Sequence, residues 1–189
     1  MNERHPGAAE VALREFEPQR DRGQLLAFFT ENHFPFHLIA RPAASEVEAR
    51  LERGAFDSAS VCSYWVLADH EAVGFMTVSD TEDPSALVDV RLADGARGRG
   101  IGRLAVRALA GAVFPRFSDL ARLEATTLVD NIAMQRAFLH AGWVKEAHYR
   151  SAGTMPDGRT TDTLGYALLR TDWASGKSQP VAWEIGQSL

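Results

Sequence analysis

The first part of the chain changes its hydrophobic period twice. Residues 11–17 alternate apolar and polar side chains, which predicts a half-buried strand. Residues 21–31 repeat apolar side chains at helical spacing and predict a helix, and residues 31–44 are irregular and aromatic. A second helix is predicted to begin with Ser45 as its cap, because Glu48 follows at the spacing of a capping box.

The middle of the chain predicts three strands and then a helix. Residues 61–68 and 72–79 are rich in β-branched and aromatic side chains, and Asp69-His70-Glu71 separates them, so a hairpin is predicted. Residues 86–92 predict the next strand. After a run of glycines, apolar residues recur at helical spacing to about Phe114.

The last third of the chain predicts one more helix between strands. Asp130 or Asn131 is a suitable cap for this helix, and Gly142 a suitable end. The turn sequence Met155-Pro156-Asp157-Gly158 joins the final two strands. The strands of this part are predicted at 123–128, 143–150 and 161–170.

Length and composition indicate a single folded unit. The chain has 189 residues, of which 46% are apolar, and it contains no repeat, so we expect one compact domain with its own core. Within it, we expect residues 1–10 to form a flexible N-terminus, residues 11–173 the domain, and residues 174–189 a C-terminal tail of small and polar side chains.

The net charge and the cysteine content exclude several classes of protein. A net charge of −5 argues against a general nucleic-acid-binding protein, because there is no basic excess to replace phosphate counterions. The one cysteine, Cys62, excludes an internal disulfide and is typical of a reducing compartment. No segment is long and apolar enough for a membrane span, and residues 1–10 lack the core of a signal peptide. We therefore expect a cytoplasmic protein with neither nucleic acid nor membrane among its partners.

The glycine run between the strand at 86–92 and the next helix is the strongest functional signal. It reads Arg97-Gly98-Arg99-Gly100-Ile101-Gly102-Arg103. Glycines allow positive φ angles and a close approach of the backbone to a ligand. The amides of such a turn face outward at the positive end of a helix dipole, which suits a diphosphate, and the arginines add charge beside it.

Three phosphate-binding motifs can be compared with this turn. A P-loop fails, because Arg103 stands where the second glycine is required. A dinucleotide fingerprint requires G-x-G-x-x-G, whereas this spacing is G-x-G-x-G. The acyl-CoA signature Arg/Gln-x-x-Gly-x-Gly/Ala matches residues 97–102 at every fixed position. A glycine-rich helix entry with solvated arginines stays open as an alternative.

Residues 97–102 resemble the coenzyme A loop of the GCN5-related N-acetyltransferases (GNAT). The predicted order of elements resembles this family over about Val11 to Asp172. The resemblance implies an α/β (α+β) acyl-CoA N-acyltransferase fold: a mixed, mostly antiparallel sheet of about seven strands, with helices on both faces, splayed between the strands at 86–92 and 123–128. It also implies acetyl-CoA as acyl donor, a small-molecule or peptide amine as acceptor, and a homodimer as one arrangement of the chain.

A second family motif lies downstream, with the form Asn-x-x-(small)-x-x-x-Tyr-x-x-x-Gly-Phe. Asn131 and Gly142 fit this frame, and the Asn131 amide is implied to bind the pantetheine arm or the diphosphate, beside its role as a helix cap. Two positions depart from it. Met134 replaces the small residue, and Phe138 replaces a tyrosine proposed to protonate the leaving thiolate. Variants without this tyrosine resemble the branch related to ribosomal-protein N-terminal acetyltransferases.

The resemblance implies where the donor lies. The pantetheine arm would run along the strand at 86–92 and bond to its backbone, and a backbone amide there would hold the thioester carbonyl. The expected CoA-binding residues are Val90, Leu92, Arg97, Gly98, Arg99, Gly100, Ile101, Gly102, Arg103, Asn131 and Phe138.

Transfer by direct attack requires a base, because an amine is largely protonated at neutral pH. The glutamate that members often place six residues before the residue equivalent to Leu92 is Ala86 in this chain. Asp89 is the first candidate in its place. Its alternative role is structural, since Asp89 and Arg91 share strand parity and can pair on one face.

Two further candidates for the base lie outside that strand. Glu124 is the second, with a structural pair to Arg122 or Arg150 as its alternative. His37, with His33 in the same aromatic loop, is the third, because imidazole ionises near neutral pH. Its alternative is simple packing among phenylalanines.

Two other functions compete with acyl transfer. Ala86 and Phe138 suggest a non-catalytic CoA-binding or sensor module, and the glycine turn alone is compatible with a different nucleotide-binding protein. The six histidines are scattered, with no His-x-x-x-His pair on a predicted helix and no cysteine partners, so we expect no metal.

Overall fold

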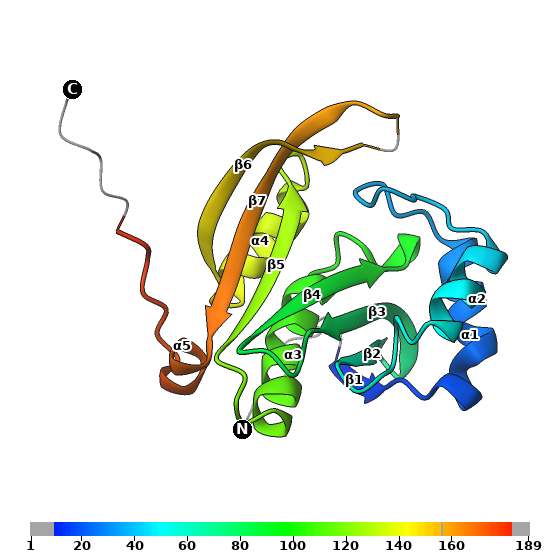
Figure 1. Cartoon of the computed structure of the whole chain (residues 1–189), viewed down its shortest axis with the longest axis horizontal. Coiled ribbons are helices and arrows are strands. Elements are labelled where there is room, and N and C mark those ends of the chain that lie inside the picture. Colours follow the sequence, from blue (N-terminus) through cyan, green and yellow to red (C-terminus); the bar gives the residue numbers. More distant parts are fainter. Residues whose placement is uncertain (1–9, 156, 183–189) are drawn as a thin grey trace, which may run out of the picture.

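The computed structural model describes residues 10–155 and 157–182, which form a seven-stranded sheet with helices around it (Figure 1). Pro156 of the predicted turn, residues 1–9 of the predicted N-terminus and residues 183–189 of the predicted tail lie outside the described residues. The elements in chain order are β1 (Val11–Glu15), α1 (Pro18–Glu31), α2 (Ala44–Glu52), β2 (Val61–Ala68), β3 (Glu71–Ser79), β4 (Ser85–Leu92), the 3-10 helix η1 (Asp94–Ala96), α3 (Ile101–Arg116), β5 (Arg122–Leu128), α4 (Ile132–His140), β6 (Val144–Thr154), β7 (Thr160–Leu169) and α5 (Arg170–Ser175).

The strand order is β1-β2-β3-β4-β5-β7-β6, and every neighbouring pair is antiparallel except β4 and β5. This confirms the expected mixed, mostly antiparallel sheet. The β2–β3 hairpin is also confirmed, with Asp69 and His70 alone in its turn at φ angles of 51° and 71°. Two positive φ angles in succession are those of a type I′ turn, whose twist matches that of the strands.

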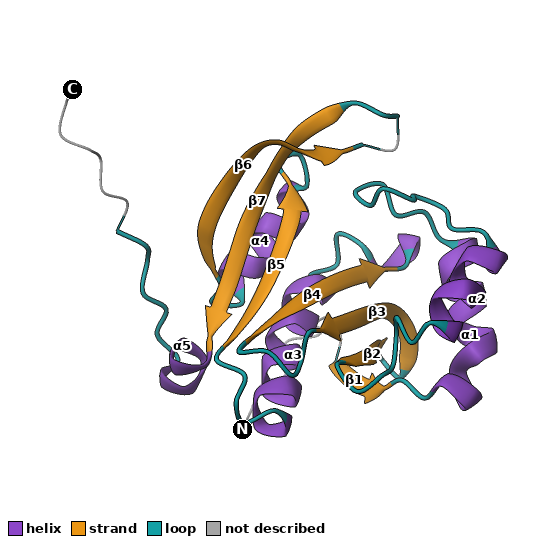
Figure 2. Ribbon diagram, viewed as in Figure 1, coloured by secondary structure: helices purple, strands orange, loops and turns teal. Residues whose placement is uncertain are grey.

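Helices lie on both sides of the sheet (Figure 2), and apolar side chains form a core on each of its faces. On one face, Trp65 of β2 and Phe75 of β3 pack with Phe28 and Phe29 of α1. On the other face, side chains of β3 and β4 pack against α3, where Leu109 is fully buried. The expectation of helices on both faces is therefore confirmed.

The sheet opens between β4 and β5. These two strands pair only where Ser85–Leu87 lies beside Arg122–Glu124, and β4 then continues to Leu92 without β5 beside it (Figure 1). The amide of Ala93 donates to the carbonyl of Val73 at 2.9 Å. Because backbone groups alternate sides along a strand, the amides of Val90 and Leu92 point the other way, into the gap. The predicted splay is confirmed.

Two helix starts differ from the prediction. α1 begins at Pro18 rather than at residue 21, because proline suits the first turn of a helix. The predicted cap of α2 at Ser45 is wrong: Ala43 is the N-cap, and its amide donates to the Glu46 carboxylate at 2.7 Å. Glu48 pairs with Arg22 of α1 instead, at 3.1 Å.

A short helix, α5, occupies residues 170–175, where the prediction passed directly from strand to tail. Trp173 of this helix packs against Phe114 of α3, with ring centroids 5.3 Å apart. The guanidinium of Arg170 donates to three backbone carbonyls around the end of α3, which fixes the start of α5 beside it.

Candidate active site

The glycine turn leads into α3 without a side chain to cap the helix. Gly98 and Gly100 have φ angles of 72° and 77°, and neither has an atom within 4 Å of where a Cβ would stand. Gly100 is the N-cap of α3 and has no side-chain hydrogen bond to give. The first amides of α3 therefore lack the usual intramolecular acceptor and are available to an anion.

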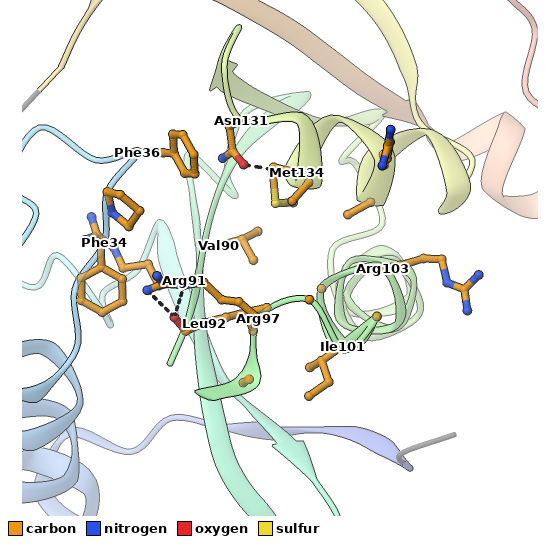
Figure 3. Close-up of a pocket in the computed structure, with 18 of the residues that line it drawn as sticks. Phe34, Phe36, Val90, Arg91, Leu92, Arg97, Ile101, Arg103, Asn131 and Met134 are labelled. Atoms are coloured by element: carbon orange, nitrogen blue, oxygen red, sulfur yellow. Dashed lines mark hydrogen bonds between the residues drawn. The ribbon is translucent and has the colours of Figure 1, made fainter. Parts of the chain in front are cut away.

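A cavity of about 550 Å³ opens in front of these amides (Figure 3). It extends between the end of β4, the start of α3, the inner face of α4 and the loop between α1 and α2. Its predicted members are Val90, Leu92, Arg97, Gly98, Gly100, Ile101, Gly102, Arg103 and Asn131. We call it the donor cavity. Of the expected CoA-binding residues, Arg99 and Phe138 do not line it.

α4 supplies residues that the sequence reasoning missed. Arg136 and His140 line the donor cavity beside Asn131 and Met134. Their spacing along the helix was the available signal, because residues one turn apart share a face. Arg136 adds a positive charge opposite the glycine turn.

Asn131 is held by two hydrogen bonds. Its Oδ1 accepts from the amide of Met134 at 3.2 Å, as an N-cap does, and its Nδ2 donates to Thr127 Oγ1 at 3.0 Å. The other end of α4 is fixed by Gly142, at a φ of 89°, where the amide of Trp143 returns to the carbonyl of Phe138. Both ends of α4 are thus set by its own sequence, as predicted.

A second cavity of about 270 Å³ adjoins the first. We call it the acceptor cavity. Both cavities are lined by Phe36, His37, Val90, Asn131 and Met134. The acceptor cavity alone is lined by Asp89 of β4 and by Thr126, Thr127 and Leu128 of β5, among others. The two cavities meet where β4 and β5 diverge.

Phe138 lines the acceptor cavity and is almost fully buried. Its ring stacks on Tyr166 of β7, with centroids 5.2 Å apart and planes 24° apart, and also contacts Trp143. The side chain at this position therefore completes the core under α4, and it offers no proton donor to the cavity.

Asp89 and His37 form a hydrogen-bonded pair beside both cavities. His37 Nε2 lies 2.9 Å from Asp89 Oδ1, and Arg91 Nε donates to Asp89 Oδ2 at 2.9 Å. Burial disfavours the Asp89 carboxylate, but the hydrogen bond from His37 and the charge of Arg91 outweigh it and hold the pKa of Asp89 well below its ordinary value. Arg91 itself lies over the rings of Phe29 and Phe34.

The second ring nitrogen of His37, Nδ1, does not take part in the hydrogen bond with Asp89. Because Asp89 is ionised, Nε2 carries the proton of that hydrogen bond, and in the neutral imidazole Nδ1 then carries a lone pair. Nδ1 is buried and has no hydrogen-bond partner among the described residues. A buried acceptor without a partner costs free energy, which a donor brought by a ligand would recover.

Glu124 and His33 lie in different surroundings. Glu124 pairs with Arg122 at 2.8 Å, and Arg122 also donates to Glu146 at 2.6 Å. Glu124 lines neither cavity, so its position fits the structural ion pair with Arg122 that was the alternative to a role as base. His33 contributes its backbone, whose amide donates to Asp94 Oδ1 at 3.2 Å.

Arg97 lies at the donor cavity, and Nε and Nη2 of its guanidinium are engaged by backbone carbonyls. Its Nε and Nη2 donate to the carbonyl of Leu92 at 3.3 and 3.2 Å, which Figure 3 marks, and its Nη2 also donates to the carbonyl of His33. It pairs with Asp94 at 2.8 Å as well. Arg103 extends away from Arg97 in the same view.

The described part of the chain holds neither a cluster of metal ligands nor a helix that could span a membrane. Over residues 10–155 and 157–182, no three His, Cys, Asp or Glu side chains gather closely enough to hold a metal ion. No helix within those residues has the length and apolar character required to cross a membrane.

Comparison with known proteins gives a family match and a set of similar structures. A family model described as an acetyltransferase (GNAT) domain matches residues 10–144. No curated protein sequence matches the chain.

Among solved structures, spermidine N-acetyltransferase from Vibrio cholerae, in complex with CoA and spermine, has a TM-score of 0.72 at 17% identity, covering 87% of this chain and 98% of that one. RimJ of Mycobacterium smegmatis with CoA-disulfide has a TM-score of 0.71 at 18% identity, covering 90% and 91%. RimL, a ribosomal L7/L12 α-N-protein acetyltransferase in complex with coenzyme A, has a TM-score of 0.70 at 17% identity, covering 84% and 93%.

Proposed function

The chain belongs to the GNAT acetyltransferase family, and from that premise we propose that it transfers an acetyl group from acetyl-CoA to a primary amine by direct attack. One observation carries the proposal: uncapped amides at the start of α3 open onto a cavity that meets a second one at the gap between β4 and β5. A polyanionic donor fits the first cavity, and an amine fits the second.

The donor is held mainly by backbone groups. The diphosphate lies against the amides that follow Gly98 and Gly100, with Arg103 and Arg136 supplying charge. The pantetheine arm follows the open edge of β4, where the amides of Val90 and Leu92 are directed into the gap. One of these amides holds the thioester oxygen as negative charge develops on it during attack.

The acceptor is a small-molecule or peptide amine. Two proteins of the same fold are named for spermidine and for ribosomal L7/L12 as acceptors, so the fold accommodates both kinds. A net charge of −5 favours the approach of a cationic amine. Thr126, Thr127 and the aromatic loop give the acceptor cavity a mixed polar and apolar wall.

Among the three candidate bases, His37 fits the geometry best. A carboxylate whose pKa is held low is a weak base, so Asp89 orients the imidazole and stabilises its protonated form. Nδ1 of His37 takes a proton from the incoming ammonium, and the imidazole must first shift to bring this nitrogen to the cavity, because Nδ1 is buried in the ligand-free protein. The neutral amine then attacks the thioester carbon.

The leaving group departs without a side-chain acid at residue 138. The carbon–sulfur bond breaks as the tetrahedral intermediate collapses, and the thiolate of CoA leaves with the electron pair. A thiol ionises near pH 8.5, so its thiolate is a stable leaving group and takes a proton from solvent. The nitrogen carries a positive charge after the attack and loses its second proton to solvent as the amide forms, and the proton on His37 also returns to solvent in the same cycle.

Release of free thiol from acetyl-CoA over a panel of amines tests the proposal. The panel contains spermidine, aminoglycosides, small monoamines and peptides with free N-termini. We expect acetyl-CoA-dependent thiol release with at least one class. Tight CoA binding with no thiol release over the whole panel would favour the CoA-binding or sensor module that Phe138 and Ala86 suggest, and absence of CoA binding would contradict both.

A further inference from the structure

The loop between α1 and α2 carries residues of both cavities, although it belongs to no helix or strand. Phe36 and His37 line both cavities, and Leu38 lines the acceptor cavity. The loop has few backbone contacts of its own, among which the amide of Phe34 donates to the carbonyl of Ala40 at 2.7 Å. The position of His37 therefore depends on what holds this loop from outside.

A set of hydrogen bonds ties the start of the loop to the segment that follows β4. The amide of Asp94 donates to Asn32 Oδ1 at 2.9 Å, and the amide of His33 donates to Asp94 Oδ1 at 3.2 Å. Arg97 pairs with Asp94 at 2.8 Å and donates to the carbonyls of His33 and Leu92. We call these four residues, Asn32, His33, Asp94 and Arg97, the loop clasp.

The forked guanidinium of Arg97 can donate several hydrogen bonds within the clasp at once. Arginine has five N–H donors in a rigid fork, and here the Nε side and Nη2 are directed to backbone oxygens and to a carboxylate. Binding a phosphate with the same groups would require breaking the contacts with His33 and Leu92. Arg103, in contrast, lines the donor cavity, and its side chain makes no hydrogen bond or ion pair within the described residues.

The middle of the loop has a second attachment to β4. His37 bonds to Asp89, and Arg91 packs over Phe34 of the loop and Phe29 of α1. The loop is thus held at two points, both of them on β4 or on the turn directly after it. The strand that lines the donor cavity is also the strand that positions the acceptor wall.

We propose that Arg97 is a positioning residue, which holds the loop of His37 against the end of β4, and that its side chain does not bind the donor diphosphate. The inference rests on the proposed function for its kinetic consequences. Its structural part, the attachment of the loop, holds with no ligand present and can be tested on its own.

The first experiment measures the loop directly, by hydrogen exchange of the backbone amides of His33, Phe34, Phe36 and His37 in the ligand-free protein. Arg97→Met and Asp94→Asn should each speed this exchange, and Arg103→Met should leave it unchanged. Unchanged exchange in both clasp variants would overturn the proposal. Since no donor or acceptor is added, this result is independent of whether the chain is an acetyltransferase, and unchanged circular dichroism shows that each variant is folded.

The second experiment separates loop positioning from phosphate binding. Arg97→Met should leave the Kd for CoA within about twofold of the wild type and raise KM for the amine about tenfold, the equivalent of one lost hydrogen bond to a charged group. Arg103→Met should show the reverse pattern.

Two further variants make the distinction sharper. Asp94→Asn removes a negative charge beside the turn, so a phosphate role alone predicts tighter CoA binding, whereas the clasp predicts a higher KM for the amine. Arg97→Lys keeps the positive charge but loses the forked guanidinium. If the clasp positions the loop, KM for the amine should therefore be raised in Arg97→Lys as it is in Arg97→Met. The opposite result is that Arg97→Met weakens CoA binding, that Arg97→Lys restores it, and that KM for the amine stays unchanged in both variants. This result would show that the Arg97 side chain binds the diphosphate.

Discussion

At the scale of single residues, Asp21 and Asp89 are both paired with arginines but have different roles. Asp21 of α1 is buried, and its carboxylate accepts from Arg14, Arg20, the Trp65 indole and the Glu17 amide. Asp89 is partly exposed at the acceptor cavity and shares its carboxylate between Arg91 and a histidine. The first links α1 to the sheet, and the second presents an imidazole.

Asp21→Asn should lower the free energy of unfolding by about 1.5–3 kcal/mol, the range for hydrogen bonds to charged groups. Desolvation opposes ionisation of Asp21, but the hydrogen bonds to its carboxylate hold its pKa below the ordinary 3.8. A lowered pKa gives a stabilisation that is complete above pH 3.8 and is lost as the pH falls through the folded-state value. Urea unfolding from pH 7 to pH 3 checks this, and a gap between wild type and variant that stays constant to pH 3 would contradict it.

His37→Gln should lower kcat by a factor of about 10²–10⁴, the usual contribution of a general base. The acid limb of the pH–rate profile should disappear in this variant, because the group that must lose its proton is gone. His33→Gln is the matched control, since His33 enters the described contacts through its backbone. Equal losses in the two variants, or an acid limb that persists without His37, would remove His37 as the base.

Gly100→Asp should weaken CoA binding about 100-fold or more, which is about 2.8 kcal/mol or more at about 1.4 kcal/mol per factor of ten, because it places a carboxylate among amides that face an anion. Gly158→Asp provides the control: Gly158 has a φ of 84° and equally open surroundings, in the β6–β7 connection. It should share the backbone strain and leave the Kd for CoA unchanged. Titration calorimetry with CoA distinguishes the two.

At the scale of elements, the pattern of apolar and β-branched residues located the strands of the described chain, because most of them, such as β2 and β7, carry a run of buried side chains. Helix ends were harder. The capping-box spacing occurs twice, at Ala43–Glu46 and at Ser45–Glu48, and the helix uses the first, where the backbone turns. α5 was missed because its packing on α3 is a contact between distant segments.

The same distinction between local signals and contacts of distant segments applies to the candidate site. The glycine turn and Asn131 were predictable, because their signals lie within a few neighbouring residues. The clasp and the His37–Asp89 pair were not, since they join residues separated by 52 to 64 positions. The sequence offered Asp89 and His37 as competing bases, and it gave no sign that the two side chains touch.

Gly74→Ala should destabilise the protein by about 1–3 kcal/mol, as overpacking does. Its Cβ would stand 2.6 Å from Leu92 Cδ2 and 2.8 Å from the carbonyl oxygen of Arg91, so β3 would push on the end of β4. CoA binding should weaken as well, because Leu92 lines the donor cavity. Gly23→Ala, in an open position of α1, should instead stabilise by about 0.5–1 kcal/mol. Urea unfolding of both variants gives the comparison.

At the scale of the whole molecule, a negatively charged chain concentrates arginines where the donor binds. The net charge is −5, yet Arg97, Arg103 and Arg136 all reach the donor cavity. Because Arg97 is engaged in the clasp, Arg103 and Arg136 carry the local attraction for a polyanion. This asymmetry suits one small anionic ligand and does not suit a nucleic-acid backbone.

CoA at 100 times its Kd should stabilise the protein by about 2.7 kcal/mol, which for a chain of this size raises Tm by about 5–10 °C. ATP and NAD at the same concentration should raise it less, since neither has an arm to lie along β4. A larger shift with ATP or NAD than with CoA would favour the nucleotide-binding alternative. Differential scanning calorimetry measures all three.

The short parallel contact between β4 and β5 has a consequence for how the chain acquires its activity. Strands β1–β4 form one antiparallel unit and β5–β7 another, and within the described residues the two units pair as strands only where Ser85–Leu87 lies beside Arg122–Glu124. Contacts that close long stretches of chain form late during folding, because their entropic cost comes first. The crevice for the donor is made by that closure and lies within neither unit. During refolding, the ability to capture CoA should therefore be the last property to return, after most of the native backbone structure has already formed.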